Sequence, residues 1–365
     1  MRQLVSRMLF FVVGGIGVLV LLELVLRVLP VTNGAYAADP SDRWPTRTLI
    51  ANSSFTYSIG WNASNIHHGH VNNLGYVSPF DYEPGASGIV VIGDSYVESR
   101  MNDYDDTLQG QLVRQLREPQ RVMNFGMSGA DLAHYVGTAQ LIGQRFAPSW
   151  AVIVITAGDY SGGFAAEPGF FRWAPERDPP VELVPELKRS ETARFVRSLA
   201  LIRYLRGNLM VGTRDLIHLH HEQDDRDETP CSRNTLSAED QTLVMKVAES
   251  LPRALGLSAD HVILVFDSDR KAIYTATPAA ARECPNRDQL ARNRLMEVAA
   301  LRGLQVIDSA PVFQAYYGST HERVDHLPQD GHWNPAAHRL MAREVARVIN
   351  DDPSRKRFSL TSSAQ

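Results

Sequence analysis

Five short apolar runs alternate with helical segments along this chain, and this alternation limits the possible folds more than any other feature. The runs are rich in valine and isoleucine, and they occupy residues 89–92, 122–125, 151–156, 261–266 and 304–307. The segments with apolar residues at helical spacing lie near residues 108–116, 132–145, 290–301 and 335–350. Buried strands that alternate with helices predict a parallel sheet covered by helices on both faces.

The length and composition suit one large folded domain or two ordinary ones, with 365 residues, 44% of them apolar and 21% charged. We predict a single domain over residues 86–351, interrupted by an insertion at about 160–250 that contains one helix over 194–209. Residues 31–85 are polar and weakly periodic, and we interpret them as a juxtamembrane region of loops and short strands. Residues 352–365 are predicted to be a disordered tail.

A long apolar segment begins the chain. Arg2 and Arg7 precede an apolar run over residues 8–29, in which Glu23 and Arg27 are the charged residues. The length suits a helix that crosses a bilayer, provided that these two charges pair at i,i+4 spacing near the far interface. Positive charges before the run keep the N-terminus cytoplasmic. This pattern predicts a single-pass anchor over residues 1–30 in the inner (cytoplasmic) membrane, with the domain on the periplasmic side.

Two other interpretations of this segment stay open. Ala35, Tyr36 and Ala37 form an A-x-A cleavage site after an apolar stretch, which is typical of a signal peptide, although the intervening gap is long and contains Pro30. A buried core helix is the remaining interpretation. An anchor and a cleaved signal peptide would both export the rest of the chain.

The charge and the cysteine content exclude some classes of function. A formal net charge of -4 lacks the strong positive charge typical of nucleic-acid binding, so no nucleic-acid partner is expected. Cys231 and Cys284 are the only cysteines, and they form either one disulfide in an exported protein or two separate thiols. Neither follows a strand as a nucleophile would, so no thiol mechanism is expected.

Two motifs that carry chemistry lie near opposite ends of the domain. Gly93, Asp94 and Ser95 follow the first apolar run, so a strand delivers the serine at its carboxyl end, where open α/β sheets bind ligands. Asp330 and His332 stand just before the last helical segment. A late Asp-x-His can supply the proton acceptor for such a serine. Together the motifs predict a serine nucleophile and its base.

These motifs resemble the SGNH (GDSL-like) hydrolase superfamily over residues 88–350. The resemblance implies a flavodoxin-like three-layer α/β/α fold with a central parallel sheet, here with an added N-terminal membrane helix. It implies that Ser95 is the nucleophile and that its own backbone N–H helps to bind the oxyanion. Residues 124–129 resemble the block whose last glycine, here Gly129, supplies a second N–H, and a glycine allows a close approach to substrate.

The last block of the family usually reads Asp-x-x-His, whereas this chain has Asp-x-His, a spacing similar to that of polysaccharide O-acetyltransferase relatives with an Asp-x-His-Trp signature. The resemblance implies that His332 is the general base and that Asp330 orients it. Asp325 and His326 form a rival pair upstream. We prefer the later pair because His332 lies directly before a capped helix start at Asn334, as the family pattern expects.

The chain departs from the family after the third apolar run. The family's Gly-x-Asn-Asp motif supplies an asparagine side chain to the oxyanion hole, and Gly158 stands where that asparagine is expected. The loss of one such donor typically costs about 10²- to 10³-fold in turnover. The site is therefore slow, recruits a donor from elsewhere, or only binds its ligand. Asp159 is interpreted as structural.

No metal or cofactor is expected. Two histidine-rich patches lack clean ligand spacing, and we interpret both as solvated loops. They consist of His67, His68 and His70, and of His218, His220 and His221. Residues 266–270 end a strand on the same rim as Ser95, where they either line the cleft or form a capped turn.

Two functions from different classes are compatible with these residues. The first is an exported serine esterase or O-acyltransferase that removes or adds acetyl groups on a cell-envelope or extracellular polysaccharide, through acylated Ser95; the carbohydrate preference rests on family analogy, and lipid or small esters stay open. The second is a catalytically weak or inactive component that binds or assembles within a polysaccharide machine, as Gly158 suggests. The expected partners are an acylated carbohydrate or other ester, the membrane and, in the second case, polysaccharide-assembly proteins.

Overall fold

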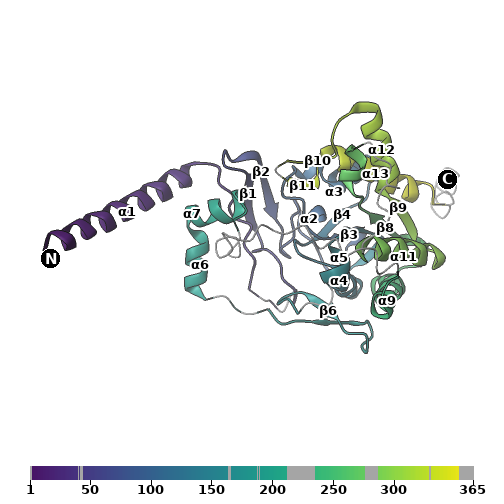
Figure 1. Ribbon diagram of the computed structural model, residues 1–365. Coiled ribbons are helices and arrows are strands. Elements are labelled where there is room, and N and C mark those ends of the chain that lie inside the picture. The colour runs from purple at the N-terminus through teal and green to yellow at the C-terminus, as the bar shows by residue number, and fades with distance from the viewer. Residues whose placement is uncertain are drawn as a thin grey trace.

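A five-stranded parallel sheet forms the centre of the molecule, with helices on both faces (Figure 1). The computed structural model describes residues 2–39, 41, 44–162, 166–186, 188, 190–211, 235–275, 287–328 and 330–352. The strands are β3 (Ser87–Gly93), β4 (Val122–Gly126), β5 (Ala147–Ile155), β8 (Val262–Phe266) and β9 (Gln305–Asp308). Their order is β4-β3-β5-β8-β9, and neighbouring strands run parallel. This is the flavodoxin-like order, so the predicted fold class is confirmed.

Alternate side chains of the central strands enter two separate hydrophobic cores. Val90 and Ile92 of β3 pack into one core, and Ile89 and Val91 pack into the other. The first core includes α4 (Leu132–Arg145), α9 (Ala238–Leu255) and α11 (Arg287–Leu301); the second includes α3 (Leu108–Gln115) and α13 (Pro335–Asn350). Strands that are buried on both faces have continuous apolar sequences, which is why all five could be found from sequence.

The sequence analysis did not identify two helices of these layers. Helix α9 lies within the stretch interpreted as an insertion, yet its Leu243, Val247 and Leu251 are buried in the first core. Helix α12 (Ser309–Thr320) was also missed, and its Phe313 is buried in the second core. The part of the chain that departs from the α/β alternation therefore ends before Ala238.

The predicted single helix over residues 194–209 is wrong, because the structure divides this stretch. Its pieces are α6 (Glu191–Ser198), α7 (Ala200–Arg203) and the π-helix η2 (Tyr204–Asn208). Leu199 is extended, with φ −66° and ψ 129°. The backbone N–H groups of Ala200 and Leu201 donate to the Glu23 carboxylate at 2.9 Å each. A distant carboxylate thus satisfies the start of α7, which helical spacing alone does not reveal.

The N-terminal segment forms α1 (Arg2–Val28), which projects away from the domain (Figure 1). Residues 6–28 are long and apolar enough to cross a membrane, with a mean hydropathy of 2.7. Arg27 Nε donates to Glu23 Oε1 at 2.8 Å, so the expected i,i+4 pair is present. Leu26 and Val31, at the domain end, are buried against Ala200.

The region 31–85 contains an antiparallel hairpin, β1 (Ser53–Ile59) and β2 (Ser64–Val71). Backbone bridges from Asn33 to Thr56 and from Ala37 to Leu49 tie the chain after α1 to this region. Shorter elements complete the described part of the chain: α2 (Ser95–Glu98), η1 (Tyr104–Asp106), α5 (Asp159–Gly162), β6 (Phe171–Trp173), β7 (Val181–Leu183), η3 (Ala259–His261), α10 (Arg270–Tyr274), β10 (Asp325–His326) and β11 (Asp330–Trp333).

Several predictions fall on residues outside the described ranges. The disulfide between Cys231 and Cys284 and the histidine patch at 218–221 belong to this group, as does nearly all of the predicted tail. They stay predictions.

Candidate active site

Ser95 begins the short helix α2 directly after β3. Asp94 caps this helix by accepting the backbone N–H of Tyr96 at 2.8 Å. A Cβ on Gly126, at the end of the neighbouring strand, would lie 2.2 Å from the backbone nitrogen of Glu98. A glycine is therefore required for β4 to pass so close to α2. This tight strand-to-helix turn sets the Ser95 hydroxyl at the carboxyl edge of the sheet.

Ser95, His332 and Asp330 form one hydrogen-bonded chain. His332 Nε2 lies 2.7 Å from Ser95 Oγ, although the two residues are 237 positions apart. His332 Nδ1 is hydrogen-bonded to Asp330 Oδ1, which also accepts the His332 backbone N–H at 3.0 Å. Both residues lie on β11, and Asn334 then caps α13 by accepting the backbone N–H groups of Ala336 and Ala337. The structure thus brings the three predicted residues together.

Tyr57 is a site residue that the sequence analysis missed. Its hydroxyl donates to Asp330 Oδ2 at 2.6 Å, from strand β1 in the region interpreted as juxtamembrane. Each oxygen of the Asp330 carboxylate therefore has a partner. The sequence carries no signal for this contact, because the two residues lie 273 positions apart and Tyr57 belongs to no motif.

The environment keeps Asp330 ionised. Burial alone would raise its pKa, but the hydrogen bond and charge of His332 and the Tyr57 hydroxyl lower that pKa below the ordinary range. Burial and the charge of Asp330 raise the pKa of Tyr57, so its hydroxyl stays a donor. An ionised Asp330 accepts a hydrogen bond from His332 Nδ1–H, which leaves Nε2 free to accept the Ser95 hydroxyl proton.

Aromatic and ionic contacts around β11 hold His332 in place. The Tyr96 ring lies 4.7 Å from the His332 ring, centroid to centroid, and its hydroxyl donates to the carbonyl of Gly331 at 3.1 Å. Trp333 Nε1 donates to Asp267 Oδ1 at 2.8 Å, and Arg270 Nη1 donates to both oxygens of Asp267 at 2.6 Å. The stretch 266–270 therefore supports the base.

The rival pair, Asp325 and His326, lies in a different setting. Asp325 accepts hydrogen bonds from Tyr274 at 2.8 Å and from Arg323 at 2.9 Å, so its carboxylate is already engaged. His326 Nε2 is 3.1 Å from Asn102 Oδ1. Among the described residues, it is His332 that reaches Ser95.

The oxyanion side of Ser95 is built from backbone. Gly129 has φ +85°, in the left-handed region that favours glycine. In the described part of the chain, the backbone N–H groups of Ser95 and Gly129 donate to no other residue. The neighbouring Ser128 is held by Glu98, which accepts its backbone N–H at 2.7 Å and its hydroxyl. Both predicted donors are thus available to a ligand.

Gly158 leaves open space where the sequence resemblance predicts an asparagine. A Cβ built on Gly158 would meet no other atom within 4 Å. Asp159 is buried and accepts the Thr156 backbone N–H at 2.6 Å and the Tyr135 hydroxyl at 3.0 Å, as its structural interpretation requires. Burial and the nearby Asp94 raise the pKa of Asp159.

A cavity of about 490 Å³ opens over the site. Its lining includes Ser95, Tyr57, Asp330 and His332. Other walls come from residues 32–36, which follow α1, and from α7 and η2. This volume lies within the range of small-ligand sites, about 300–1,000 Å³.

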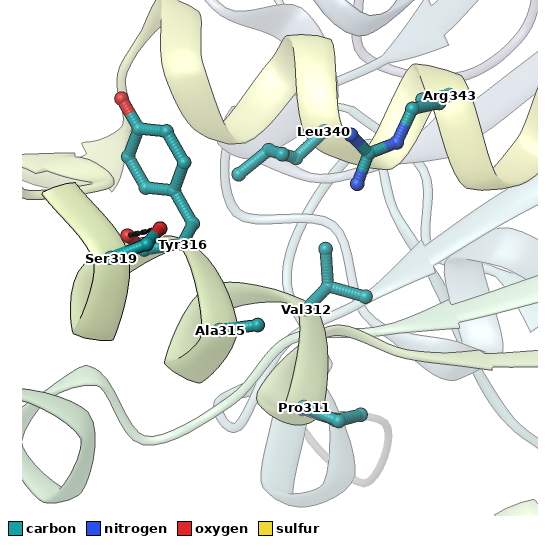
Figure 2. Close-up of a pocket in the computed structure, with 7 residues that line it drawn as sticks. All are labelled: Pro311, Val312, Ala315, Tyr316, Ser319, Leu340 and Arg343. Carbon is teal, nitrogen blue, oxygen red and sulfur yellow. Dashed lines mark hydrogen bonds between the residues drawn. The ribbon is translucent and has the colours of Figure 1, made fainter.

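A second cavity lies away from this site, between α12 and α13 (Figure 2). It measures about 470 Å³, and its lining includes Val312, Tyr316 and Arg343. Its described lining shares no residue with the cavity over Ser95. Residues that line this second cavity are therefore suitable control positions for variants of the cavity over Ser95.

The histidines of the first patch lie on strand β2, which corrects their interpretation as a loop. His67 Nδ1 is 2.8 Å from Asp103 Oδ1, and His68 Nδ1 is 3.1 Å from Thr56 Oγ1. Within the described ranges, no group of three or more His, Cys, Asp or Glu side chains is placed to hold a metal ion.

Fold and site together define a three-layer α/β/α protein with a Ser–His–Asp chain at the carboxyl edge of its sheet. No protein-family model and no curated protein sequence matches the chain. Solved structures that it resembles include a member of the lipolytic G-D-S-L family from Veillonella parvula, with 13% identity over 73% of this chain and 100% of the other, and a TM-score of 0.36.

Two further structures have comparable scores. A lipase/acylhydrolase from Enterococcus faecalis is 16% identical over 73% of this chain and 95% of its own, with a TM-score of 0.39. A variant of an acetyl xylan esterase from Geobacillus stearothermophilus is 15% identical over the same shares, with a TM-score of 0.37. At these identities and scores the likeness carries no argument about activity, and function is inferred from this chain's own residues.

Proposed function

We propose that this protein is a membrane-anchored serine esterase or O-acyltransferase of the SGNH type, which works through an acyl-serine intermediate. The hydrogen-bonded chain from Ser95 through His332 to Asp330 is the observation that carries this proposal. A nucleophile, a base in reach of it and a carboxylate that orients the base are the parts that such chemistry requires.

The first half of the reaction forms the acyl-serine. Ser95 Oγ attacks the ester carbonyl carbon while its proton passes to His332 Nε2, and Asp330 stabilises the resulting imidazolium. The backbone N–H groups of Ser95 and Gly129 bind the oxyanion. The tetrahedral intermediate collapses, His332 returns the proton to the departing alcohol, and the acyl group stays on Ser95.

The second half releases the acyl group to an acceptor. His332 Nε2 takes a proton from the acceptor hydroxyl, whose oxygen attacks the acyl carbon. The bond from that carbon to Ser95 Oγ then breaks, and His332 returns the proton to Ser95 Oγ. Water as the acceptor gives hydrolysis, and a sugar hydroxyl gives acyl transfer. We propose an acetyl group on a cell-envelope or extracellular polysaccharide, by analogy with SGNH enzymes that act on polysaccharides.

We further propose that α1 is retained as an inner-membrane anchor, with the domain on the periplasmic side. Cleavage after Ala37 would remove Glu23, which caps α7, and would break the bridges from Asn33 and Ala37 to the hairpin region. It would also remove residues 32–36 from the wall of the cavity. These contacts support an uncleaved segment that belongs to the folded domain.

The second candidate function is that of a catalytically weak or inactive component that binds ester-bearing polysaccharide. The open space at Gly158 favours it, because one oxyanion donor expected from the resemblance is missing. This candidate predicts that Ser95 is unreactive.

Activity and labelling of the full chain separate the two functions. The full chain is used because residues 32–36, which follow α1, line the cavity. It is purified in a nonionic detergent, which keeps the apolar α1 in solution. Wild type and Ser95→Ala are compared for p-nitrophenyl acetate turnover and for covalent labelling by a fluorophosphonate. We expect wild type to show both and the variant neither. Two equally inert proteins with matching circular dichroism would contradict catalysis and favour the binding function.

A further inference from the structure

The cavity over Ser95 has a strongly basic wall. Four arginines line it, namely Arg100, Arg197, Arg203 and Arg206. Among its described lining residues, Asp330 is the acidic one, and that carboxylate is already hydrogen-bonded to His332 and Tyr57. Positive charge in this wall is thus in excess over the negative charge that the lining supplies.

Two of these arginines have donors to spare. Arg203 Nη1 donates to the carbonyl of Thr32 at 3.1 Å, whereas its Nε is buried with no hydrogen-bond partner within the described structure. Arg206 is exposed, and none of the described residues forms an ion pair or hydrogen bond with its guanidinium. Arg100 differs, because its Nε lies 2.8 Å from Glu98 Oε1. Arg203 Nη2 and the Arg206 guanidinium have no hydrogen-bond partner among the described residues, and an anion in the cavity would accept hydrogen bonds from them.

The segment that carries Arg203 and Arg206 is fixed in place. Glu23 caps the start of α7, and Asn208 at the end of η2 donates to Ser58 Oγ at 2.8 Å and accepts the Thr32 backbone N–H at 3.0 Å. Both ends of the segment are therefore tied to the chain around α1 and to β1. A cation wall held in this way is preorganised for a ligand.

We propose that this wall binds a carboxylate or phosphate group of the substrate, so that the ester acted on at Ser95 is part of an anionic molecule. That the ligand carries an ester rests on the proposed function. That it carries a negative charge rests on the arginines that line the cavity. A guanidinium presents planar, paired donors that match the oxygens of carboxylate and phosphate. One cavity holds both Ser95 and the arginines, so a single ligand spans them.

A pair of esters that differ in charge tests this directly. The probes are para-acetoxybenzoate, which is anionic, and its neutral methyl ester. Their binding to Ser95→Ala is measured by calorimetry in a nonionic detergent, and their turnover is measured with wild type. We expect the anionic ester to bind about 10-fold more tightly than the neutral one.

Arg206→Gln should remove this preference and leave the affinity for the neutral ester within about twofold, because Arg206 is exposed and forms no ion pair or hydrogen bond with a described residue. Arg203→Gln should act in the same direction. Arg343→Gln is the matched control, since Arg343 is an exposed arginine that lines the other cavity (Figure 2). Equal binding of both esters, or an equal loss of both in Arg206→Gln, would overturn the proposal.

The two readouts separate this inference from the proposed function. Selective binding of the anionic ester by Ser95→Ala, with no turnover by wild type, would end the catalytic proposal and keep the anion site. Turnover of both esters with equal kcat/KM, and without selective binding, would keep catalysis and end the anion site.

A vesicle comparison identifies the source of the anion. Full-length wild type and Arg206→Gln are placed in phosphatidylcholine vesicles with and without phosphatidylglycerol. If lipid phosphate occupies the wall, phosphatidylglycerol should weaken the apparent affinity for the anionic ester, seen as a higher KM, more in wild type than in Arg206→Gln. An equal response of both proteins, with the selectivity for the anionic ester intact, would assign the wall to a soluble anionic substrate.

Discussion

On one side of Ser95, His332 and Asp330 are held by side chains from several parts of the chain, including Tyr57 of β1 and Tyr96 of α2. On the other side, the available donors are backbone N–H groups, and Gly158 leaves open space. The base side is thus complete in this structure, whereas on the oxyanion side Gly158 supplies no side-chain donor. The residues that transfer the proton are therefore held by more side-chain contacts than the groups that would stabilise the oxyanion.

The largest effect should come from breaking the base side. His332→Ala removes the proton acceptor 2.7 Å from Ser95 Oγ, and we expect p-nitrophenyl acetate turnover to fall by about 10²- to 10⁴-fold. His326→Ala is the control, because His326 contacts Asn102 and leaves the Ser95 hydrogen bond intact. A comparable loss in both variants would show that His332 is not the specific base.

Filling the oxyanion side should have the next largest effect, in the opposite direction. Gly158→Asn places an amide where a Cβ meets nothing within 4 Å, and we expect turnover to rise, by up to about 10²-fold. Gly158→Ala controls for the added Cβ and should change little. Unchanged turnover in Gly158→Asn would mean that the space at this position does not face the oxyanion.

Tyr57→Phe should weaken the base side without removing it. The variant leaves Asp330 Oδ2 without its 2.6 Å donor, and we expect kcat to fall by about 10-fold, with the KM for p-nitrophenyl acetate unchanged. The loss of that donor should also move the pKa of Asp330 upward. A change in KM alone would instead make Tyr57 a substrate contact.

The smallest effect should be on the free energy of unfolding, through Asp94 in the turn between β3 and α2. Burial raises the pKa of Asp94 to about 6 from an ordinary 3.8, so the folded state binds more protons than the unfolded state within this window. The free energy of unfolding should therefore fall as pH rises through the window. Wild type should gain about 2–4 °C in Tm between about pH 7.5 and pH 5 relative to Asp94→Asn, by circular dichroism. The same pH response in both proteins would contradict this role of Asp94.

The five strands of the sheet were predictable because each is buried on both faces. Burial selects continuous apolar residues such as Ile89 to Ile92, and these stand out from the polar segments around them. Helix α9 was placed in the insertion because the polar stretch before it hid its start. The break at Leu199 was missed because the carboxylate that caps α7 comes from Glu23, in a different part of the chain.

The sequence by itself determined where the site residues stand relative to the strands and helices: Ser95 and Gly129 follow successive strands, and His332 precedes a capped helix. Parallel strands bring their carboxyl ends to one edge, so motifs at those ends must converge. The tertiary structure alone decided that Tyr57 reaches Asp330 and that Arg203 and Arg206 line the same cavity as Ser95. These contacts depend on how distant segments pack, and packing between segments leaves no periodic trace in the sequence.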